Sequence, residues 1–232
     1  SLKIVFDTAE KIGLKVDVHC DETDDPHSKH IETVCAHTMD RSMGGHVVAG
    51  HCTAMHSYNG PAANKIITSI VRSGVQIITN PLDSVVLQGR FDDYPKRRGL
   101  TRVPELLNAG GVVGVGHDSV CDPWYPLGVG NIMDAAYMVV HLCHLSGQEE
   151  MRRVFEMLVS DNHMPFGGQP RIQVGETALL LVHSLSDPVD ILRMRRLPLF
   201  VIHNGRIVAT NSQPVSTVLS QEFDLGVIPQ TF

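Results

Sequence analysis

The chain has 232 residues, of which 43% are hydrophobic and 19% charged, and its formal net charge is −6. This composition supports a packed core and argues against nucleic acid or an anionic membrane as a partner. Five cysteines, an odd number without a Cys-x-x-Cys pair, argue against a disulfide framework and favour a cytoplasmic protein. Thirteen histidines are the unusual feature, and they direct attention to metal or acid–base chemistry.

The chain opens as if in the middle of an amphipathic helix that runs to Lys11 and ends at Gly13. We therefore expect an N-terminal part to be missing from this sequence. Apolar runs and helical patterns then alternate, and Asn80-Pro81 is interpreted as a break that opens a long loop. The pattern predicts strands over 16–19, 47–51, 75–79 and 112–115, and helices around 31–35, 62–73, 103–109, 131–145 and 149–160.

Strand–helix alternation at this spacing predicts an α/β fold with a parallel sheet and right-handed crossovers. Four such units amount to half of an eightfold β/α barrel. From about Gly167 the pattern changes to short strands over 178–183, 199–203 and 206–210, which predict a small β module. We therefore divide the chain into domains 1–166 and 167–232. Because a half barrel leaves two strand edges unpaired, we expect it to pack beside its missing half.

Ionisable residues end three of the four predicted strands. The first strand carries Asp17 and His19, the second ends in His51, and Asp118 follows the fourth. The carboxyl ends of parallel barrel strands meet at one mouth, where catalytic groups gather. Side chains alternate along a strand, so Asp17 and His19 share a face, whereas Glu22 lies past the strand end, over the mouth.

Imidazole and carboxylate are suitable ligands for Zn²⁺ or Fe²⁺. His19 and Asp118 supply two ligands, one fewer than a catalytic zinc usually has, so this chain alone falls short. A simpler interpretation is that a strand-end histidine is an ordinary hydrogen-bonded residue. Likewise, a solvated acidic loop would explain Glu22 together with Asp21, Asp24 and Asp25.

Several longer runs make the chain resemble the amidohydrolase superfamily, and within it the bacterial cytosine deaminases. The runs are 19–22 (HCDE), 50–60, Asn80-Pro81, 87–99 and 116–128. The resemblance implies that the four strands are the fifth to eighth of a TIM barrel and that the tail is part of a small β-sandwich. It also implies one divalent metal ion, Fe²⁺ or Zn²⁺. The implied roles are metal ligands His19 and Asp118, catalytic residues Glu22 (proton shuttle), His51 and Asp118, and substrate contacts Ser119 and Trp124.

This sequence also departs from the family pattern. The His-x-His pair that ends the first barrel strand is absent from it, as is the fourth-strand region. Ser119 stands where cytosine deaminases usually carry a second acidic residue. A hydroxyl carries no charge, so the group that it reads on the substrate can differ. Isocytosine, creatinine-like rings and triazines therefore stay open beside cytosine.

The expected activity of the intact protein is metal-dependent hydrolytic deamination of cytosine or a related cyclic amidine, with ammonia released after attack by metal-bound hydroxide. We expect a small-molecule substrate, no nucleic acid or membrane partner, and a homo-oligomer. One alternative is a ring-opening cyclic amide hydrolase of the same superfamily, although Glu22 speaks against it. The other is a half barrel that is catalytically incomplete and only packs against another chain.

Overall fold

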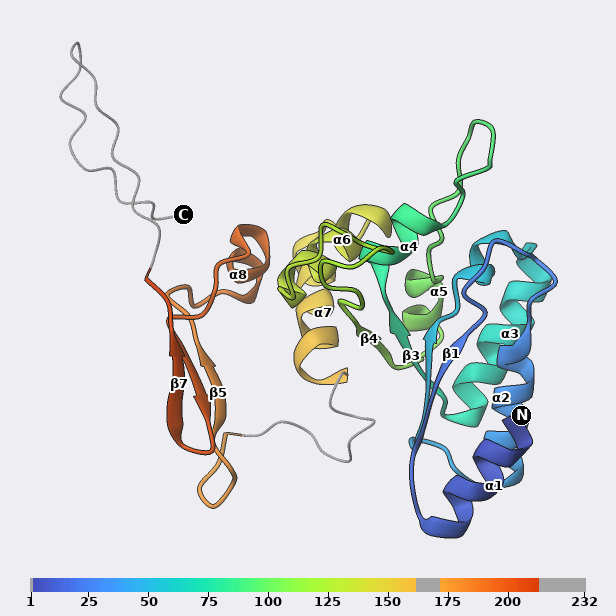
Figure 1. The fold of residues 1–232 in the computed structure, drawn as a ribbon, viewed down its shortest axis with the longest axis horizontal. Coiled ribbons are helices and arrows are strands. Elements are labelled where there is room, and N and C mark those ends of the chain that lie inside the picture. Colours follow the sequence, from blue (N-terminus) through green and yellow to red (C-terminus); the bar gives the residue numbers. More distant parts are fainter. Residues whose placement is uncertain (1, 162–171, 213–232) are drawn as a thin grey trace. The chain divides into compact units, whose positions relative to one another are not determined.

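The computed structural model describes residues 2–161 and 172–212 of the chain, which divides into two compact units (Figure 1). The first unit is Ser1–Pro170 and the second is Arg171–Phe232. The domain boundary predicted between residues 166 and 167 lies outside the described residues. Within the described part of the chain, no helix is long and apolar enough to cross a lipid bilayer.

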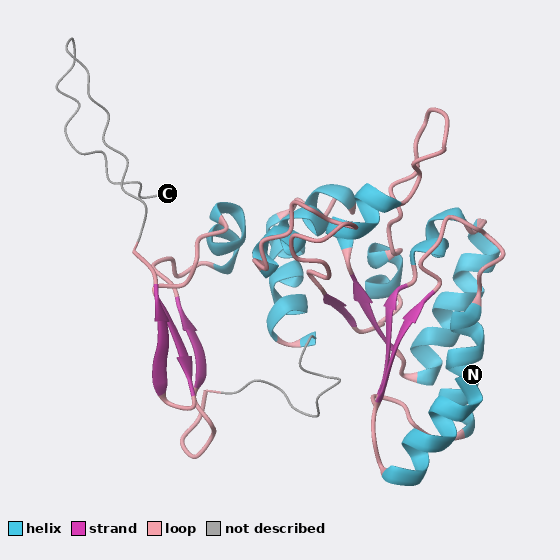
Figure 2. Cartoon of the chain, viewed as in Figure 1, coloured by secondary structure: helices cyan, strands magenta, loops and turns pink. Residues whose placement is uncertain are grey.

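A four-stranded parallel sheet in the order β1-β2-β3-β4 forms the centre of the first unit (Figure 2). Helical segments carry the chain from each strand back to the start of the next, as parallel neighbours require. The predicted α/β fold with a parallel sheet is therefore confirmed. The strands are β1 (Val16–Cys20), β2 (Val47–His51), β3 (Gln76–Thr79) and β4 (Val113–Val115).

Local sequence signals explain where the helices begin and end, and α3 is the clearest case. The side chain of Asn59 accepts a hydrogen bond from the N–H of Ala62, and Pro61 lies in the first turn. Gly74 ends the helix at φ 68°, a conformation that favours glycine. The first unit contains α1 (Leu2–Ile12), α2 (His30–Asp40), η1 (Thr53–Ser57), α3 (Gly60–Ser73), α4 (Pro81–Leu87), α5 (Val103–Asn108), α6 (Ile132–Leu142) and α7 (Gln148–Val159).

The core lies between the sheet and its helices, and β1 shows which face it occupies. Val16 and Cys20 are buried, whereas Asp17 and His19, on the other face of the same strand, are exposed. The helix predicted around 31–35 is part of α2, and its apolar residues Ile31, Val34 and Cys35 are all buried. The sheet therefore buries its apolar face against the helices and leaves the face that bears His19 open at β1.

Among the described residues, two short α-helices are missing from the sequence prediction, as is the 3₁₀ helix η1. Asn80-Pro81 does end β3, but the chain enters α4 at once instead of a long loop, because proline is well suited to a first helical position. In the second unit, α8 (Pro188–Met194) begins in the same way, and the Asp187 side chain accepts a hydrogen bond from the Val189 N–H. Helices of this length are too short to give a clear apolar period.

The second unit is a three-stranded antiparallel sheet in the order β5-β6-β7, flanked by α8. Its strands agree with the predicted ones, and the turn between β6 and β7 lies at Asn204-Gly205. Both turn residues have positive φ, 51° and 74°, which is typical of a two-residue hairpin. The strands are β5 (Leu179–Val182), β6 (Phe200–His203) and β7 (Arg206–Thr210).

Candidate active site

The carboxyl ends of β1 and β2 bring two histidine rings together. In the parallel register His19 is paired with Gly50, and Cys20 with His51. Gly50 has no side chain, so the space beside His19 on that face of the sheet is free. The rings of His19 and His51 consequently lie 4.7 Å apart, centroid to centroid, at an angle of 58°.

An unusual backbone conformation directs His51 toward this cluster. Strict alternation would point its side chain to the helix-covered face, together with Val47 and Ala49. His51 instead has φ 66°, in the left-handed region that residues other than glycine rarely adopt. Asp118, after β4, has φ 65°. Both candidate residues therefore occupy strained turns at strand ends, a feature that is common at functional sites.

His51 lies between two carboxylates. Glu22 Oε1 is 3.6 Å from its Nδ1, and Asp118 Oδ2 is 3.6 Å from its Nε2. Neither distance is short enough for a hydrogen bond. Glu22 lies past the end of β1, as predicted from its position three residues after His19. The structure thus brings together four of the six predicted site residues.

Three of these four side chains could hold a metal ion between them. One donor atom each from His19, Glu22 and His51 lies within 4.8 Å of the other two. Two imidazoles and a carboxylate are ligand types that Zn²⁺ and Fe²⁺ accept. This set differs from the predicted ligand pair, because Glu22 and His51 accompany His19 in it and Asp118 does not.

Burial controls the charge of His51, whose side chain is 1% exposed. Burial lowers the pKa of the imidazole, since a charged ring loses its water, while Glu22 and Asp118 raise the pKa and His19 lowers it. The net shift is downward. His51 therefore favours the neutral form, in which one ring nitrogen donates a hydrogen bond and the other accepts one.

Asn80 is a neighbour of His51 that sequence reasoning missed as a site residue. Its Nδ2 lies 3.2 Å from Nε2 and 3.4 Å from Nδ1 of the His51 ring. The side chain is buried at the end of β3, the strand between those that carry His51 and Asp118. Its position at a strand end was the available signal, but the Asn-Pro pair was interpreted as a break and as a family motif, without a role for the Asn80 side chain.

Ser119 and Trp124, the two predicted substrate contacts, are not among the four residues that the structure brings together. Ser119 donates hydrogen bonds from its backbone and its hydroxyl to Asp83, whose pKa is nevertheless raised because the carboxyl is buried. Asp83 was also missed, and its Oδ1 has no hydrogen-bond partner. Trp124 is 61% exposed in the loop after β4, and its backbone N–H donates to Asp122 Oδ1 at 2.9 Å.

The acidic turn after β1 is not a solvated loop, so that interpretation is wrong for Asp21. The Asp21 side chain is fully buried and accepts hydrogen bonds from the N–H groups of His30 and Ile31 and from the hydroxyl of Ser28. Burial raises its pKa, but these hydrogen bonds outweigh burial and lower it. Asp21 therefore stabilises the start of α2, while Asp25 is exposed.

Asp24 belongs to a second polar cluster, which we call the loop brace and define as Asp24, His56, Asp92 and Arg97. Asp24 Oδ2 accepts a hydrogen bond from the N–H of Gly89 at 2.9 Å, and its carbonyl accepts one from Arg97 at 2.8 Å. Arg97 also binds both carboxylate oxygens of Asp92 at 2.6 Å. Within the basic segment 96–98, Arg97 therefore acts as an ion-pairing residue.

His56 completes the loop brace. Its Nδ1 accepts a hydrogen bond from the N–H of Gly99 at 2.8 Å, and its Nε2 lies 3.1 Å from Asp24 Oδ1, outside hydrogen-bond geometry. Burial lowers the pKa of His56, Asp24 raises it and Arg97 lowers it, with a net downward shift. The loop brace thus ties the segment 89–99 to the turn that carries Glu22.

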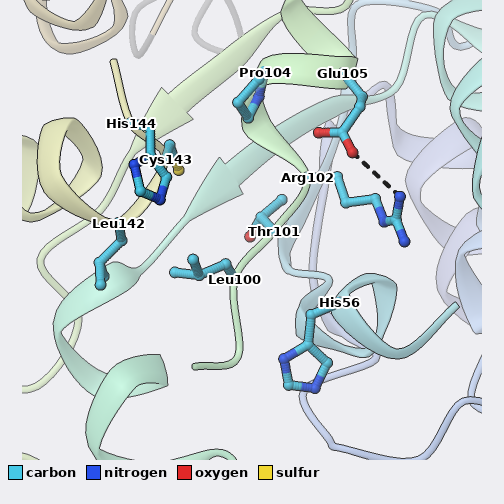
Figure 3. A pocket seen from close by; sticks show the side chains of 9 residues that line it. All are labelled: His56, Leu100, Thr101, Arg102, Pro104, Glu105, Leu142, Cys143 and His144. Carbon is cyan, nitrogen blue, oxygen red and sulfur yellow. Dashed lines mark hydrogen bonds and ion pairs between the residues drawn. The ribbon is translucent and has the colours of Figure 1, made fainter. Parts of the chain in front are cut away.

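A pocket of about 280 Å³ lies outside the cluster, beside α5 and the end of α6 (Figure 3). His56 lines one part of it, and the ion pair between Arg102 and Glu105, 3.2 Å apart, lies on another. None of the six predicted site residues lines this pocket. The cluster is therefore the better candidate site, since it gathers the groups that can perform chemistry. The other lining residues are Leu100, Thr101, Pro104, Leu142, Cys143 and His144.

Comparison with known proteins identifies the family of the chain. The sequence matches the amidohydrolase family over residues 1–209. The chain belongs to the amidohydrolase family. It is similar to pterin deaminase of Rhizobium rhizogenes (strain K84), with 26% identity over 200 residues that cover 84% of this chain and 45% of that protein. It is also similar to N-isopropylammelide isopropyl amidohydrolase of Pseudomonas sp. (strain ADP), with 23% identity over 90% of this chain and 49% of that protein.

Among solved structures, 5-methylcytosine deaminase from Klebsiella pneumoniae liganded with phosphonocytosine is similar with a TM-score of 0.89 and 35% identity. The match covers 94% of this chain and 54% of that one. A zinc-bound adenosine deaminase from Xanthomonas campestris shares the fold at a TM-score of 0.57 and 12% identity. The amidohydrolase chain described here thus spans about half the length of the relatives it matches.

Proposed function

We propose that the full-length protein is a metal-dependent hydrolase that removes an amino group from cytosine or a related small heterocycle and releases ammonia. The observation that carries this proposal is the position of His51, held between Glu22 and Asp118 with the His19 ring 4.7 Å away. The 35% identity to a 5-methylcytosine deaminase supports the same class of substrate.

This proposal includes an architecture for the whole protein. The four parallel strands would be the fifth to eighth of a (β/α)₈ barrel, and β5–β7 would be part of a small β-sandwich beside it. The other barrel strands would come from the remainder of the full-length protein. Two facts support this: the exposed, His19-bearing face of β1, and the coverage of about half of each relative.

A divalent metal ion fits the chemistry of the cluster, which gathers imidazole and carboxylate groups. Of these, His19 is a proposed ligand; the second proposed ligand is Asp118, as the family resemblance implies, and further ligands would come from the other half of the barrel. When bound, such an ion lowers the pKa of water and so provides a nucleophile at neutral pH. Whether the ion is Zn²⁺ or Fe²⁺ is an outcome of metal analysis, because both accept imidazole and carboxylate ligands.

The residues of this chain can move the protons that the reaction needs. Hydrolytic deamination forms a C–O bond from water to the ring carbon and breaks the C–N bond to the amino group. Asp118 accepts a proton from the attacking water, and neutral His51 orients that water by a hydrogen bond. Protonated Glu22, over the mouth, protonates the adjacent ring nitrogen. The proton that Asp118 took from the water is then relayed through Glu22 to the departing amine, which leaves as ammonia. As the C=O bond forms, the remaining hydroxyl proton returns to Glu22 and restores its starting state.

The identity of the substrate ring is to be decided by experiment, because Ser119 stands where cytosine deaminases usually carry an acidic residue. A serine is uncharged, and the Ser119 hydroxyl donates to Asp83, so a group on the ring would meet the hydroxyl oxygen and not a full charge. The substrate panel therefore contains cytosine, 5-methylcytosine, isocytosine, creatinine and an amino-triazine.

The test is an ammonia assay of the metal-loaded, full-length protein against this panel. We expect ammonia from at least one pyrimidine and a loss of turnover when the metal is removed by a chelator. A ring-opened product without ammonia would replace the proposal by amide hydrolysis. Absence of both products across the panel would reject the proposal.

A further inference from the structure

We propose that Asn80 is a positioning residue that fixes the ring of His51 between its two carboxylates, and that residue 116 is glycine to leave space for the Asn80 amide. This inference rests on the proposed function for its kinetic readout. Its structural basis, a three-residue arrangement across neighbouring strand ends, is independent of the substrate.

The His51 ring needs a partner of this kind. Its approaches to Glu22 and Asp118, at 3.6 Å each, are too long to hold a ring orientation by hydrogen bonding. The amide of Asn80 is closer, with Nδ2 3.2 Å from Nε2 and 3.4 Å from Nδ1. Asn80 is itself 7% exposed, so solvent does not compete strongly for its amide.

The nature of the amide group decides what it can do for the ring. An NH₂ group donates and cannot accept, so it bonds to a ring nitrogen that carries no proton. It cannot satisfy both ring nitrogens in this way, since a neutral imidazole has one free lone pair. Asn80 therefore favours a single tautomer of His51 and leaves the N–H of the other nitrogen for a carboxylate or a water. This is the role that groups behind a metal or water site usually play.

Gly116 is the second half of the arrangement. A Cβ at this position would lie 2.0 Å from Asn80 Oδ1 and 3.1 Å from Ile78 Cγ2. Gly116 is not among the residues with positive φ, so its backbone conformation does not demand glycine. Glycine is needed at position 116 because any side chain there would occupy the space of the Asn80 amide. The ends of β2, β3 and β4 thus carry, in spatial order, the ring, the amide that holds it, and the gap that accepts the amide.

The experiment is a double-mutant cycle in the metal-loaded, full-length enzyme, with Asn80→Ala, Gly116→Ala and the double variant. We expect Asn80→Ala to lower kcat by roughly 10- to 100-fold, the usual cost of losing a supporting group behind the reacting residues, with KM changed less than about 3-fold. Gly116→Ala should lower kcat to a similar degree, because its Cβ displaces the amide. In the Asn80→Ala background the same change should cost little, since the clash is gone.

Thr79→Val is the matched control. Thr79 is buried at the preceding position, where its side chain points to the opposite face, and valine preserves its shape. We expect its kcat and KM to equal those of the unmodified enzyme. If the kcat losses of the two single variants multiply in the double variant, the two residues act independently. That result would overturn the proposal that residue 116 is glycine to leave space for the Asn80 amide. A rise in KM at unchanged kcat would overturn the positioning role, because it would mean that Asn80 binds substrate.

A second measurement separates this inference from the proposed function. Imidazole ¹H–¹⁵N spectra of the full-length protein report the tautomer of His51, assigned by its loss in His51→Asn. We expect one dominant tautomer in the unmodified protein and a mixture in Asn80→Ala, whatever the substrate is. An unchanged tautomer in Asn80→Ala would reject the inference even if deamination is confirmed. If Asn80→Ala shows a mixture of His51 tautomers but the unmodified protein deaminates no substrate, the positioning inference stands and the proposed deaminase function is rejected.

Discussion

His51 and His56 lie on one segment of the chain, each beside a carboxylate, but the structure uses them differently. Both are buried, with side chains 1% and 9% exposed, and burial lowers the pKa of both. His56 accepts a backbone hydrogen bond of 2.8 Å and helps to hold a loop. His51 has a left-handed backbone and carboxylate neighbours at 3.6 Å, beyond hydrogen-bond range.

The comparison teaches that a buried histidine–carboxylate pair is not by itself a sign of catalysis. His56 is used for stability, because one ring nitrogen is occupied by the backbone of the loop that it holds. His51 has one ring nitrogen left beyond the Asn80 amide and two nearby carboxylates, which can still bind a water, a proton or an ion. The same distinction separates Asp21, saturated with hydrogen bonds, from Glu22 next to it.

The largest expected effect is at Glu22, which, like His51, is assigned a role in the reaction. Glu22→Gln retains the shape of the side chain but removes its ability to transfer a proton. We expect kcat of the full-length enzyme to fall by about 10²–10⁴-fold, with an unchanged melting temperature. Asp25→Asn, an exposed acid on the same turn, is the control and should retain full activity. Equal activities for the two variants would remove Glu22 from the mechanism.

His51→Asn compared with His56→Asn tests the contrast directly. Loss of the His51 ring should lower kcat by about 10²-fold, as expected for a group that orients the reacting water by a hydrogen bond. His56→Asn should stay within about 3-fold, because the Asn oxygen replaces Nδ1 as the acceptor for Gly99 and the loop brace stays closed. Both rates come from the same ammonia assay. A greater kinetic loss at His56 than at His51 would reverse our assignment.

Asp21→Ala should be the most destabilising change in the turn. It removes the acceptor for three hydrogen bonds at the start of α2 and leaves buried donors without a partner. We expect a loss of about 2–3 kcal/mol in the free energy of unfolding, measured by urea denaturation of the full-length protein. A loss equal to that of Asp25→Ala would contradict the structural role of Asp21.

A smaller effect is expected from the pH dependence of His56. Its pKa in the folded state is lower than the value of about 6.5 that applies to the unfolded chain. The unfolded chain therefore binds more protons between the two values, so stability falls as the pH drops through that window. Protonation of Nδ1 also removes the acceptor for Gly99. Urea denaturation from pH 7.5 to pH 5 should show this loss in the unmodified protein and a shallower slope in His56→Asn, with His27→Asn as an exposed control.

The convergence of positions 19, 51 and 118 was predictable, because parallel strands place their carboxyl ends at one edge and the hydrophobic pattern located the strands. Glu22 followed from its spacing to His19. The tertiary contacts were not predictable from local patterns. Gly89 meets Asp24 across 65 residues, and the burial of Asp21 depends on where α2 begins. Asn80 was missed because Asn-Pro carries a strong turn signal that conceals a side-chain role.

The left-handed backbone at His51 and Asp118 has a consequence for protein engineering. Glycine would relieve the strain at either position, and a redesign that selects for thermal resistance alone would favour it. Such a variant would lose a side chain that the proposed reaction needs, so its activity would fall even where the backbone is less strained. Selection for heat tolerance in this protein should therefore exclude both positions and seek its gains among the solvent-facing helix residues, where no chemistry is lost.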